Sequence, residues 1–341
     1  MSKDLMLLTG GHPVHRRFGH SINAMNYLLP NQASKNQIVP IKALNLLKAS
    51  FSIPIGYDYF LCESCYYYPA IKRRFGMLGK TKIINMNVGP LLYHILTGRL
   101  GGIERKVMLR LLQDVDAHLV YGTYGGELLS HFNIKKPVRT IYPFIKESLL
   151  NDLLRTTPDL CSKSITIMAA RDPFNKGLDI IFRAMGLVSD YDSAAKLNLL
   201  SPISASEIEA VPGYDAAFVN ILNNVPDVSK VLQSSSLYVQ PSRGDAFPVA
   251  SLEALAAGLP TIVSSENGVK EVIGKIDGSM IVDLDHKALA DAIISFFDKS
   301  QKEKTELSEQ SRANAAFFNE RHMLELFKKQ LSSLKEELDG A

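Results

Sequence analysis

Two clusters of charged residues in the second half of the chain have the types and spacing that a phosphorylated ligand requires. In the first, Arg171-Asp172-Pro173-Phe174-Asn175-Lys176-Gly177, two cations bracket a turn after a predicted strand, Ile165–Ala169. A guanidinium offers a planar fork of donors and an ammonium offers a compact charge, and both groups suit phosphate oxygens. Taken alone, the same turn is equally compatible with a solvated loop.

The second cluster lies in the segment Pro241–Glu271 and holds two carboxylates, Asp245 and Glu253, with seven residues between them. We expect Asp245 in the loop after a strand at Leu237–Gln240, and Glu253 one turn into a helix at Val249–Ala257. Both carboxylates would then face one edge of a sheet, beside the free N–H groups of a helix N-terminus, which favour an anion. Spacing alone does not distinguish this arrangement from two surface acids on an ordinary strand–helix unit.

Strands and helices alternate along both halves of the chain. The apolar runs predict strands at Leu5–Leu8, Tyr59–Cys62, Lys82–Met86, His118–Tyr121, Ile165–Ala169, Leu197–Ser201, Ala217–Ile221, Leu237–Gln240, Thr261–Ser264 and Met280–Val282. Helical spacing of apolar residues predicts helices over Ile22–Leu29, Ile103–Val115, Lys176–Val188, Val228–Gln233 and Val249–Ala257, and a charged helical tail from Gln301. Such alternation favours parallel sheets covered on both faces. The predicted fold is α/β, with two doubly wound, Rossmann-like domains facing across a cleft and ligands at the carboxyl ends of the strands.

The length of 341 residues also indicates two domains. The polar stretch Asn151–Ser164 separates the two halves, so we place an N-terminal domain at residues 1–160 and a C-terminal domain at 161–320. Residues 321–341 are predicted to form a helix that packs back on the N-terminal domain.

Composition narrows the class of protein. A hydrophobic fraction of 46% and a charged fraction of 21% are those of a globular chain. No apolar run approaches the roughly 20 residues that a spanning helix needs, and three cysteines cannot form a disulfide framework, so a cytoplasmic location is expected. Cys62 and Cys65 form a CxxC without a partner pair, and the Asp-x-Asp triplets do not follow strands beside other ligands, so no metal site is predicted.

The net charge of +3 hides an asymmetry between the two halves. Residues 1–150 hold 19 Lys and Arg against 8 Asp and Glu, and the remaining residues hold 19 against 27. The basic half favours an anionic partner, either a membrane surface or a phosphorylated acceptor. A nucleic-acid-binding protein or a DNA-modifying transferase is an alternative, but the basic residues are spread over several turns without a known nucleic-acid motif.

Over about Ser164–Gly274 the chain resembles the C-terminal domain of the retaining glycosyltransferases of family 4 (group 1), which have the GT-B fold. The arginine and lysine of the first cluster, Arg171 and Lys176, match that family in spacing. Further matches follow in order, at Pro241, Ser242, Asp245, Phe247, Pro248, Glu253, Ala254, Gly258 and Pro260, with Gly268 and Glu271 after them. The first half resembles the family only in topology.

The resemblance implies a role for each matching residue. Arg171 and Lys176 would hold the diphosphate of a nucleotide sugar, Glu253 the ribose hydroxyls, and Asp245 the hydroxyls of the donor sugar. Backbone N–H groups around Phe247, Pro248 and Val249 would add contacts, and the glycine loop Gly10–Gly11 would approach the donor phosphates. On the acceptor side the candidates are His12, Arg16, Asn87 and His94.

The reaction so implied is the metal-independent, retaining transfer of a hexosyl group from a UDP- or GDP-sugar to a hydroxyl of a glycan or lipid-linked acceptor. No cofactor is implied beyond the nucleotide sugar, and a peripheral position at the inner membrane face fits the basic half. Two positions depart from the family. Asp245 stands where glutamate is usual, and Asn87 stands where a histidine often follows the strand Ile83–Met86. These departures keep a second alternative open, a non-catalytic module that binds sugar nucleotides.

Overall fold

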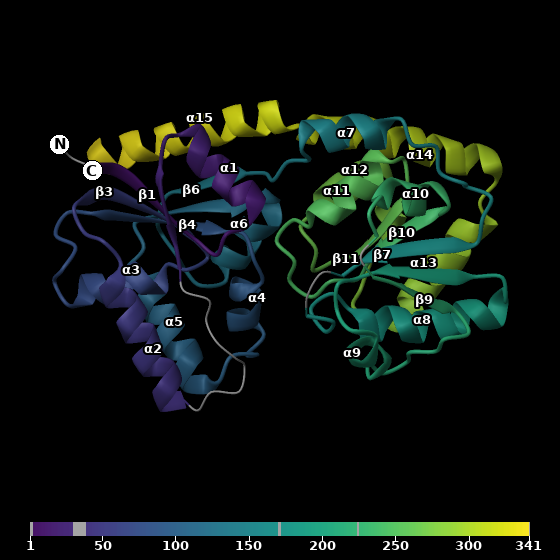
Figure 1. The fold of residues 1–341 in the computed structure, drawn as a ribbon, viewed down its shortest axis with the longest axis horizontal. Coiled ribbons are helices and arrows are strands. Elements are labelled where there is room, and N and C mark those ends of the chain that lie inside the picture. Colours follow the sequence, from purple (N-terminus) through teal and green to yellow (C-terminus); the bar gives the residue numbers. More distant parts are fainter. Residues whose placement is uncertain (1–2, 30–38, 170–171, 224, 341) are drawn as a thin grey trace. The chain divides into compact units, whose positions relative to one another are not determined.

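The computed structural model describes residues 3–29, 39–169, 172–223 and 225–340. The chain divides into two compact units. The N-terminal unit comprises Met1–Tyr142 and Met323–Ala341, and the C-terminal unit comprises Pro143–His322. In the described residues each unit contains one six-stranded parallel sheet with helices on both faces (Figure 1). The predicted α/β class with two doubly wound sheets is therefore confirmed.

The sheet of the N-terminal unit has the strand order β2-β1-β3-β4-β5-β6. Its strands are β1 (Lys3–Thr9), β2 (Met25–Leu28), β3 (Tyr57–Glu63), β4 (Lys82–Asn87), β5 (Ala117–Tyr121) and β6 (Val138–Ile141). Its helices are α1 (Pro13–Ser21), α2 (Val39–Ser52), α3 (Tyr67–Arg74), α4 (Leu91–Leu96), α5 (Gly102–Leu112), α6 (Gly122–Ser130) and most of α15 (Glu320–Gly340). Every residue of β5 is buried, as expected of a strand covered on both faces.

The predicted helix over Ile22–Leu29 is wrong. The helix in this region is α1, which begins at Pro13, where proline fits the first turn. It ends at Ser21, and Asn23 follows in the left-handed region with φ of 54°. The chain then turns so that Met25–Leu28 pairs with β1 as strand β2.

The sheet of the C-terminal unit has the order β12-β11-β10-β7-β8-β9. Its strands are β7 (Ser164–Met168), β8 (Lys196–Leu200), β9 (Val219–Leu222), β10 (Leu237–Gln240), β11 (Thr261–Ser264) and β12 (Ile281–Val282). Its helices are α7 (Glu147–Leu154), α8 (Leu178–Tyr191), α9 (Ala205–Glu209), α10 (Val228–Gln233), α11 (Val249–Ala256), α12 (Lys270–Ile276), α13 (His286–Asp298) and α14 (Gln301–Ala315), with 3-10 turns η1 (Gly278–Met280) and η2 (Ala316–Phe318). In Figure 1, α8 and α13 cover one face of the sheet and α11 and α12 the other.

The contacts divide the chain before α7, at Tyr142–Pro143, whereas the sequence-based boundary lies at residue 160. The reason is that α7 buries Leu150 and Leu153 and packs against α11 of the C-terminal unit. The second division, at Met323, assigns nearly all of α15 to the N-terminal unit. There Phe327 packs on Phe18 of α1, with 4.4 Å between the ring centroids.

Each sheet reverses its strand order at one point, and these two points place the candidate residues. In the N-terminal unit the reversal lies between β1 and β3, and in the C-terminal unit it lies between β7 and β10. The loops that leave the carboxyl ends of such neighbouring strands diverge and open a crevice, which is where doubly wound sheets bind ligands. The loop after β7 carries the first charged cluster, and the loop after β10 carries Asp245.

Candidate functional site

The loops after β7 and β10 are tied together at the reversal point of the C-terminal unit. Asp172 adopts a positive φ of 52°, and its carboxylate accepts hydrogen bonds from the backbone N–H (3.2 Å) and the side-chain amide (2.8 Å) of Asn175. The backbone N–H of Arg243, in the second loop, donates to the carbonyl of Asn175 at 2.7 Å. The turn that carries Lys176 is therefore fixed in shape and held against the neighbouring loop.

Gly177 permits the close approach of these loops. Its φ of 72° lies in the left-handed region, and a Cβ at this position would lie 2.0 Å from the carbonyl oxygen of Pro241. Only glycine combines that backbone conformation with that contact. Packing thus explains why glycine follows lysine in the sequence motif, because the close approach at Gly177 brings Lys176 to the end of β10.

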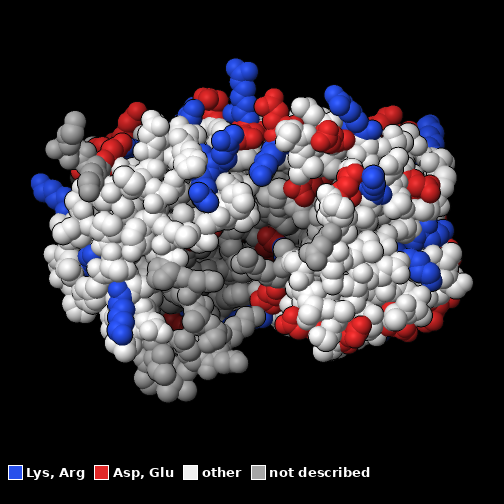
Figure 2. Space-filling view, in the orientation of Figure 1, with Lys and Arg blue, Asp and Glu red and all other residues white. Residues whose placement is uncertain are grey.

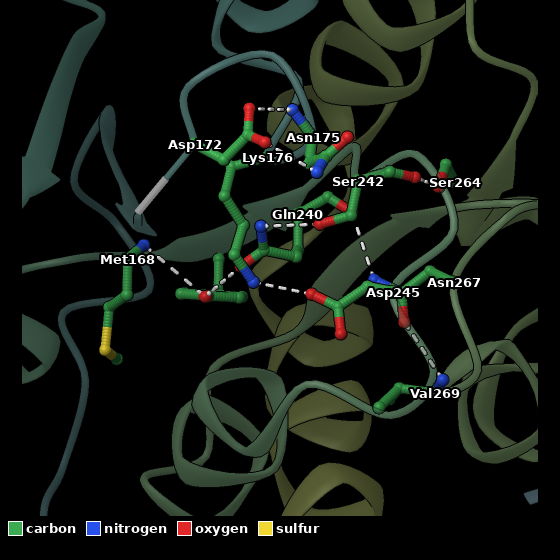
Figure 3. Close-up of polar contacts among 11 residues, drawn as sticks. Met168, Asp172, Asn175, Lys176, Gln240, Ser242, Asp245, Ser264, Asn267 and Val269 are labelled. Carbon is green, nitrogen blue, oxygen red and sulfur yellow. Dashed lines mark hydrogen bonds and ion pairs between the residues drawn. The ribbon is translucent and has the colours of Figure 1, made fainter. Parts of the chain in front are cut away.

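Lys176 and Asp245 form an ion pair across the reversal point, with 2.5 Å between Nζ and Oδ2 (Figure 3). Their side chains are 24% and 21% exposed, so solvent and a ligand can reach both. The sequence predicted that these two residues serve one ligand, and the structure brings them together from positions 69 residues apart. Arg171, the other predicted cation, lies outside the described residues.

Arg243 is a site residue that the sequence analysis missed. Its guanidinium donates to both carboxylate oxygens of Asp179, at 2.7 and 2.9 Å, and to the carbonyl of Phe174 at 2.6 Å. It also lies over the Phe174 ring, 4.0 Å from its centroid. Arg243 therefore clamps the turn before Lys176 onto the start of α8. The sequence could have indicated Arg243 as a candidate, because it is the only cation within Pro241–Pro248, but it could not indicate its partner.

The loop around Asp245 is braced from the other side by the segment after β11. Asp245 pairs with Asn267 in an isolated parallel bridge, and its carbonyl accepts the N–H of Gly268 at 2.9 Å. A Cβ on Gly268 would lie 1.7 Å from the carbonyl oxygen of Ala246. This packing positions Phe247 and Pro248, both buried, at the entry to α11, where first-turn N–H groups can face an anion.

Glu253, within α11, is largely buried and carries an altered acidity. Burial raises the pKa of Glu253 to about 7, and the charge of Lys146 offsets part of that rise. The hydroxyl of Tyr238, on β10, is also buried, and its pKa is raised by burial and further by the charges of Glu253 and Asp245.

A buried chain of side chains supports this end of β10. The backbone N–H of Met168 donates to the hydroxyl of Tyr238 at 3.4 Å, and that hydroxyl donates to Oε1 of Gln240 at 2.7 Å. The amide of Gln240 donates to the hydroxyl of Ser242 at 2.9 Å (Figure 3). Because each buried polar group here has a partner, the chain rigidifies the strand end from which the Asp245 loop departs.

We predict that Glu253→Gln stabilises the ligand-free protein at alkaline pH. Because the folded-state pKa is raised, the contribution of Glu253 to the free energy of unfolding is fully present below its ordinary pKa and is lost as pH rises through about 7. The amide has no proton to lose, so the variant should exceed the wild type by about 1–3 kcal/mol at pH 8 and match it more closely at pH 5, where the buried Glu253 is protonated. Thermal unfolding at both pH values measures this. Glu309→Gln, on the exposed face of α14, is the control, and equal pH dependence in all three proteins would contradict the prediction.

At the reversal point of the N-terminal unit, Glu63 holds the glycine loop. Its carboxylate accepts the N–H of Gly10 at 3.0 Å and the hydroxyl of Thr9, and it pairs with Nδ1 of His15 at 2.6 Å. Burial acts to raise the pKa of Glu63, but the hydrogen bonds and charge of His15 and the bonds from Thr9 and Gly10 outweigh it, so the pKa lies below its usual value. Glu63 was missed by the sequence analysis, because nothing in the sequence marks it as the neighbour of Gly10.

The predicted acceptor-side residues occupy different environments. His12 and Arg16 are exposed at the start of α1, over which Figure 2 shows Lys and Arg side chains gathered. His94 is half-buried on α4. Asn87, in contrast, is buried at the end of β4 and hydrogen-bonds with Asn85 at 2.7 Å and with Nδ1 of His118 at 3.4 Å. Their roles toward an acceptor stay predictions.

His118, on β5, is the third member of the buried polar cluster that includes Asn85 and Asn87 of β4. Burial lowers its pKa to about 4, and the charge of Lys136 contributes to the shift, so the ring is neutral near pH 7. A neutral ring can accept from the amide of Asn87. The side chain of Asn87 is therefore engaged within the sheet.

The remaining sequence features have structural partners. Asp114 and Asp116, one of the Asp-x-Asp triplets, pair with Arg74 at 2.5 Å and with Arg73 at 2.6 Å. Cys65 is buried, and its pKa is raised mainly by burial. In the part of the chain that the structure describes, no group of three or more His, Cys, Asp or Glu side chains could hold a metal ion, and no helix is long and apolar enough to span a membrane.

Comparisons with known proteins agree with this geometry. Residues 163–299 match the family model of the glycosyl transferases group 1. The chain is 26% identical over 192 residues to the N,N'-diacetylbacillosaminyl-diphospho-undecaprenol alpha-1,3-N-acetylgalactosaminyltransferase of Campylobacter jejuni, a match that covers 55% of this chain and 48% of that enzyme. The chain thus spans about half the length of this curated relative.

Two solved structures share the fold over nearly the whole chain. The sucrose-phosphate synthase of Thermosynechococcus elongatus superposes with a TM-score of 0.74 at 15% identity, covering 99% of each chain. Anabaena HepE in complex with UDP-glucose superposes with a TM-score of 0.66 at 14% identity, covering 96% of this chain and 91% of the other. The fold is thus the GT-B fold of nucleotide-sugar glycosyltransferases. The group 1 match covers residues 163–299, in agreement with the resemblance stated from the sequence.

Proposed function

We propose that this chain is a retaining glycosyltransferase that moves a hexosyl group from a nucleotide diphosphate to a hydroxyl acceptor. The observation that carries the proposal is the meeting of Lys176 and Asp245 at the reversal point of the C-terminal sheet, 2.5 Å apart and accessible. A cation for a diphosphate and a carboxylate for sugar hydroxyls are the two groups that one nucleotide sugar needs. Their position beside the N-terminus of α11 adds backbone N–H groups for the same anion.

Each donor contact is proposed for a separate part of the nucleotide sugar. Arg171 and Lys176 bind the diphosphate, and Glu253 binds the ribose hydroxyls. Asp245 binds the donor sugar, and the backbone around Phe247 and Val249 completes the contacts. Gly10 and Gly11 are assigned to the donor phosphates on resemblance alone.

The chemistry follows from where charge develops. As the bond from the sugar to the diphosphate breaks, negative charge grows on the leaving diphosphate and positive charge grows on the sugar. A fixed ammonium at the diphosphate stabilises the first charge, and a carboxylate near the sugar tolerates the second. When the donor binds, the phosphate oxygens compete with Asp245 for the ammonium of Lys176, which frees the carboxylate for sugar hydroxyls. The leaving phosphate itself can accept the proton of the acceptor hydroxyl, so the proposal requires neither a metal nor a protein base.

For the acceptor, we propose a lipid-linked glycan reached at the cytoplasmic face of a membrane. The support is the excess of Lys and Arg in residues 1–150, 19 against 8 acidic residues, since basic surfaces are attracted to anionic leaflets and phosphorylated lipids. The Campylobacter relative is named for a diphospho-undecaprenol acceptor, which is of this chemical class.

A nucleotide screen tests the proposal. UDP-, GDP- and ADP-hexoses should be compared by thermal unfolding, and we expect UDP-sugars to raise the midpoint, because HepE binds UDP-glucose. A ligand at 100 times its Kd adds about 2.7 kcal/mol to the free energy of unfolding. Glu253→Gln should weaken the binding of the same nucleotide by about 1.5–3 kcal/mol in calorimetry, with Glu309→Gln as the control.

Turnover then separates an enzyme from a binding module. Slow hydrolysis of the bound donor, with release of a sugar whose initial anomeric form matches that of the donor by NMR, would support retaining transfer. Binding of a nucleotide sugar without any turnover would favour the non-catalytic module. A lack of response to every nucleotide would refute both.

A further inference from the structure

One surface of the N-terminal unit exposes large apolar side chains in a continuous set. On α2 these are Leu44, Leu47 and Phe51, and Ile55 follows the helix; after α3 come Phe75 and Met77. All six are between 37% and 60% exposed. We call these six residues the outer patch. The ring of Phe75 packs on that of Phe51, with 5.1 Å between the centroids, so the two parts of the patch are one surface.

The spacing on α2 shows that its exposed apolar residues are not scattered. Leu44, Leu47 and Phe51 recur at i, i+3 and i+7, which places them on one face of the helix. The opposite face carries Leu46 and Ala49, which pack against the core of the unit. A helix on a globular domain usually has one apolar face, which packs on the core. Because α2 has two apolar faces, we expect its outer face to contact a second apolar surface.

The outer patch is held rigidly. The ammonium of Lys72, which is 3% exposed, donates to the carbonyl of Phe51 at 3.2 Å and to that of Ile53. This buried cation ties the end of α2 to α3. The apolar side chains therefore protrude from a fixed base, so docking does not require the helices to reorganise.

The two segments that contain the outer patch carry only positive charges. Residues 39–57 and 64–82 hold seven Lys and Arg and no Asp or Glu. Lys72 is buried, and Arg73 and Arg74 are paired with Asp116 and Asp114, whereas Lys48 and Lys80 are exposed. Apolar side chains among cations are the combination that binds the interface of an anionic bilayer, where the apolar groups enter the headgroup boundary and the cations meet acidic lipids.

We propose that the outer patch docks on an anionic membrane surface. A second copy of this chain fits less well, because a symmetric contact would set the same cations against each other. The exposure and charge of these residues support membrane docking. That docking serves to present a lipid-linked acceptor rests on the proposed function.

Sedimentation with vesicles tests the proposal. We expect the wild type to bind vesicles of phosphatidylcholine with phosphatidylglycerol, to bind pure phosphatidylcholine weakly, and to dissociate as salt rises, because salt screens the attraction. Leu47→Asp should lower the partition coefficient about tenfold, because it removes an apolar contact and sets a negative charge against acidic lipids. Lys48→Glu should lower it severalfold.

Two matched controls exist on the C-terminal unit. Leu187→Asp changes a leucine that is 40% exposed on α8, close to the 37% of Leu47, and Lys287→Glu reverses an exposed lysine of α13. Neither should change vesicle binding. Leu47→Ser is the second variant if Leu47→Asp fails to fold by circular dichroism.

Three outcomes would overturn the proposal. They are equal binding by Leu47→Asp and the wild type, equal binding of the wild type to neutral and acidic vesicles, and a dimer that Leu47→Asp dissociates without any vesicle binding. Calorimetry with the nucleotide on the same samples separates this proposal from the proposed function. Leu47→Asp should bind the nucleotide as the wild type does, and a wild type that binds vesicles but no nucleotide would refute only the proposed function.

Discussion

Lys176→Ala should lower the kcat of sugar transfer by about 10²–10³-fold, which is the usual loss when one preorganised contact to a developing charge is removed. The ammonium of Lys176 is fixed by the turn from Asp172 to Gly177 and lies 2.5 Å from Asp245. Its interaction with the diphosphate strengthens as the leaving group gains charge. The loss should therefore appear mainly in kcat and less in the KM for the donor.

Steady-state kinetics of the wild type and four variants measures this effect. Lys163→Ala is the matched control, because Lys163 is also in the C-terminal unit and also paired with an aspartate, Asp192, at 3.5 Å. It should leave kcat within about twofold of the wild type, because this partly exposed ion pair lies outside the proposed donor site. Arg171→Ala should resemble Lys176→Ala, and the double variant should lose less than the product of the two single losses, because both cations act on one diphosphate.

The same assay with a chelator tests whether the cations replace a metal. EDTA should leave the rate of the wild type unchanged. Near-normal turnover of Lys176→Ala and Arg171→Ala, or activity abolished by EDTA, would show that these cations are not what stabilises the leaving group.

The second large effect concerns Gly177→Ala, which should destabilise the C-terminal unit by about 2–5 kcal/mol. The left-handed conformation costs a residue with a Cβ about 1–2 kcal/mol, and overpacking against Pro241 typically adds 1–3 kcal/mol. The new Cβ would start 2.0 Å from the carbonyl oxygen of Pro241, so the loops after β7 and β10 must separate. Because Lys176 precedes Gly177 directly, donor binding should weaken along with stability.

Gly186→Ala is the control, and we expect it to stabilise the protein rather than destabilise it. Gly186 lies in the interior of α8, and a Cβ there would meet nothing within 4 Å. Alanine should therefore raise the free energy of unfolding by about 0.5–1 kcal/mol. Chemical denaturation of both variants measures the difference, and an unchanged midpoint in Gly177→Ala would mean that the two loops are not packed as described.

Strands buried on both faces were the most predictable part of the fold. The predicted strands Leu237–Gln240 and Thr261–Ser264 have the same bounds as β10 and β11, because short, mainly apolar runs with β-branched or aromatic residues between turn signals favour a buried strand. The helix α1 was missed, since its sequence is rich in histidine and arginine and its contacts to the core are few, among them Val14 and Phe18. Its stability comes from tertiary burial, which periodicity does not report.

The helix α5 shows the same limit. The stripe Ile103, Val107, Leu111 and Val115 predicted a helix with one buried face, but α5 ends at Leu112, before Val115. The helix is present, but Ile103 is 81% exposed and Val107 is 42% exposed, whereas Leu111 is buried. Periodicity identifies a helix, but it does not say how far along its length the sheet covers it.

The candidate site was predictable as a set of residues and not as an arrangement. Lys176 and Asp245 were expected to share a ligand, but their contact arises because β10 pairs with β7, a crossover that no local spacing encodes. Arg243 was missed for the same reason, since its partner Asp179 lies 64 residues away. The predicted domain boundaries, the roles of the site residues and the acceptor-side residues stay predictions, and the experiments above test the roles of Arg171, Lys176 and Glu253.

The assignment of Met323–Ala341 to the N-terminal unit has a consequence for biosynthesis. Phe327 packs on Phe18, and the carboxylate of Asp339 accepts the hydroxyl of Tyr59, so part of the packing around β1 and β3 waits until these residues leave the ribosome. At about 5–20 residues per second, translation of the intervening segment takes on the order of 10–40 s. During that time the C-terminal unit, which is continuous in sequence, can fold first, and the N-terminal unit displays the apolar side chains that α15 later covers. A released chain that ends at His322 should therefore have a C-terminal unit that resists protease, while its N-terminal unit remains open to cleavage and to chaperones.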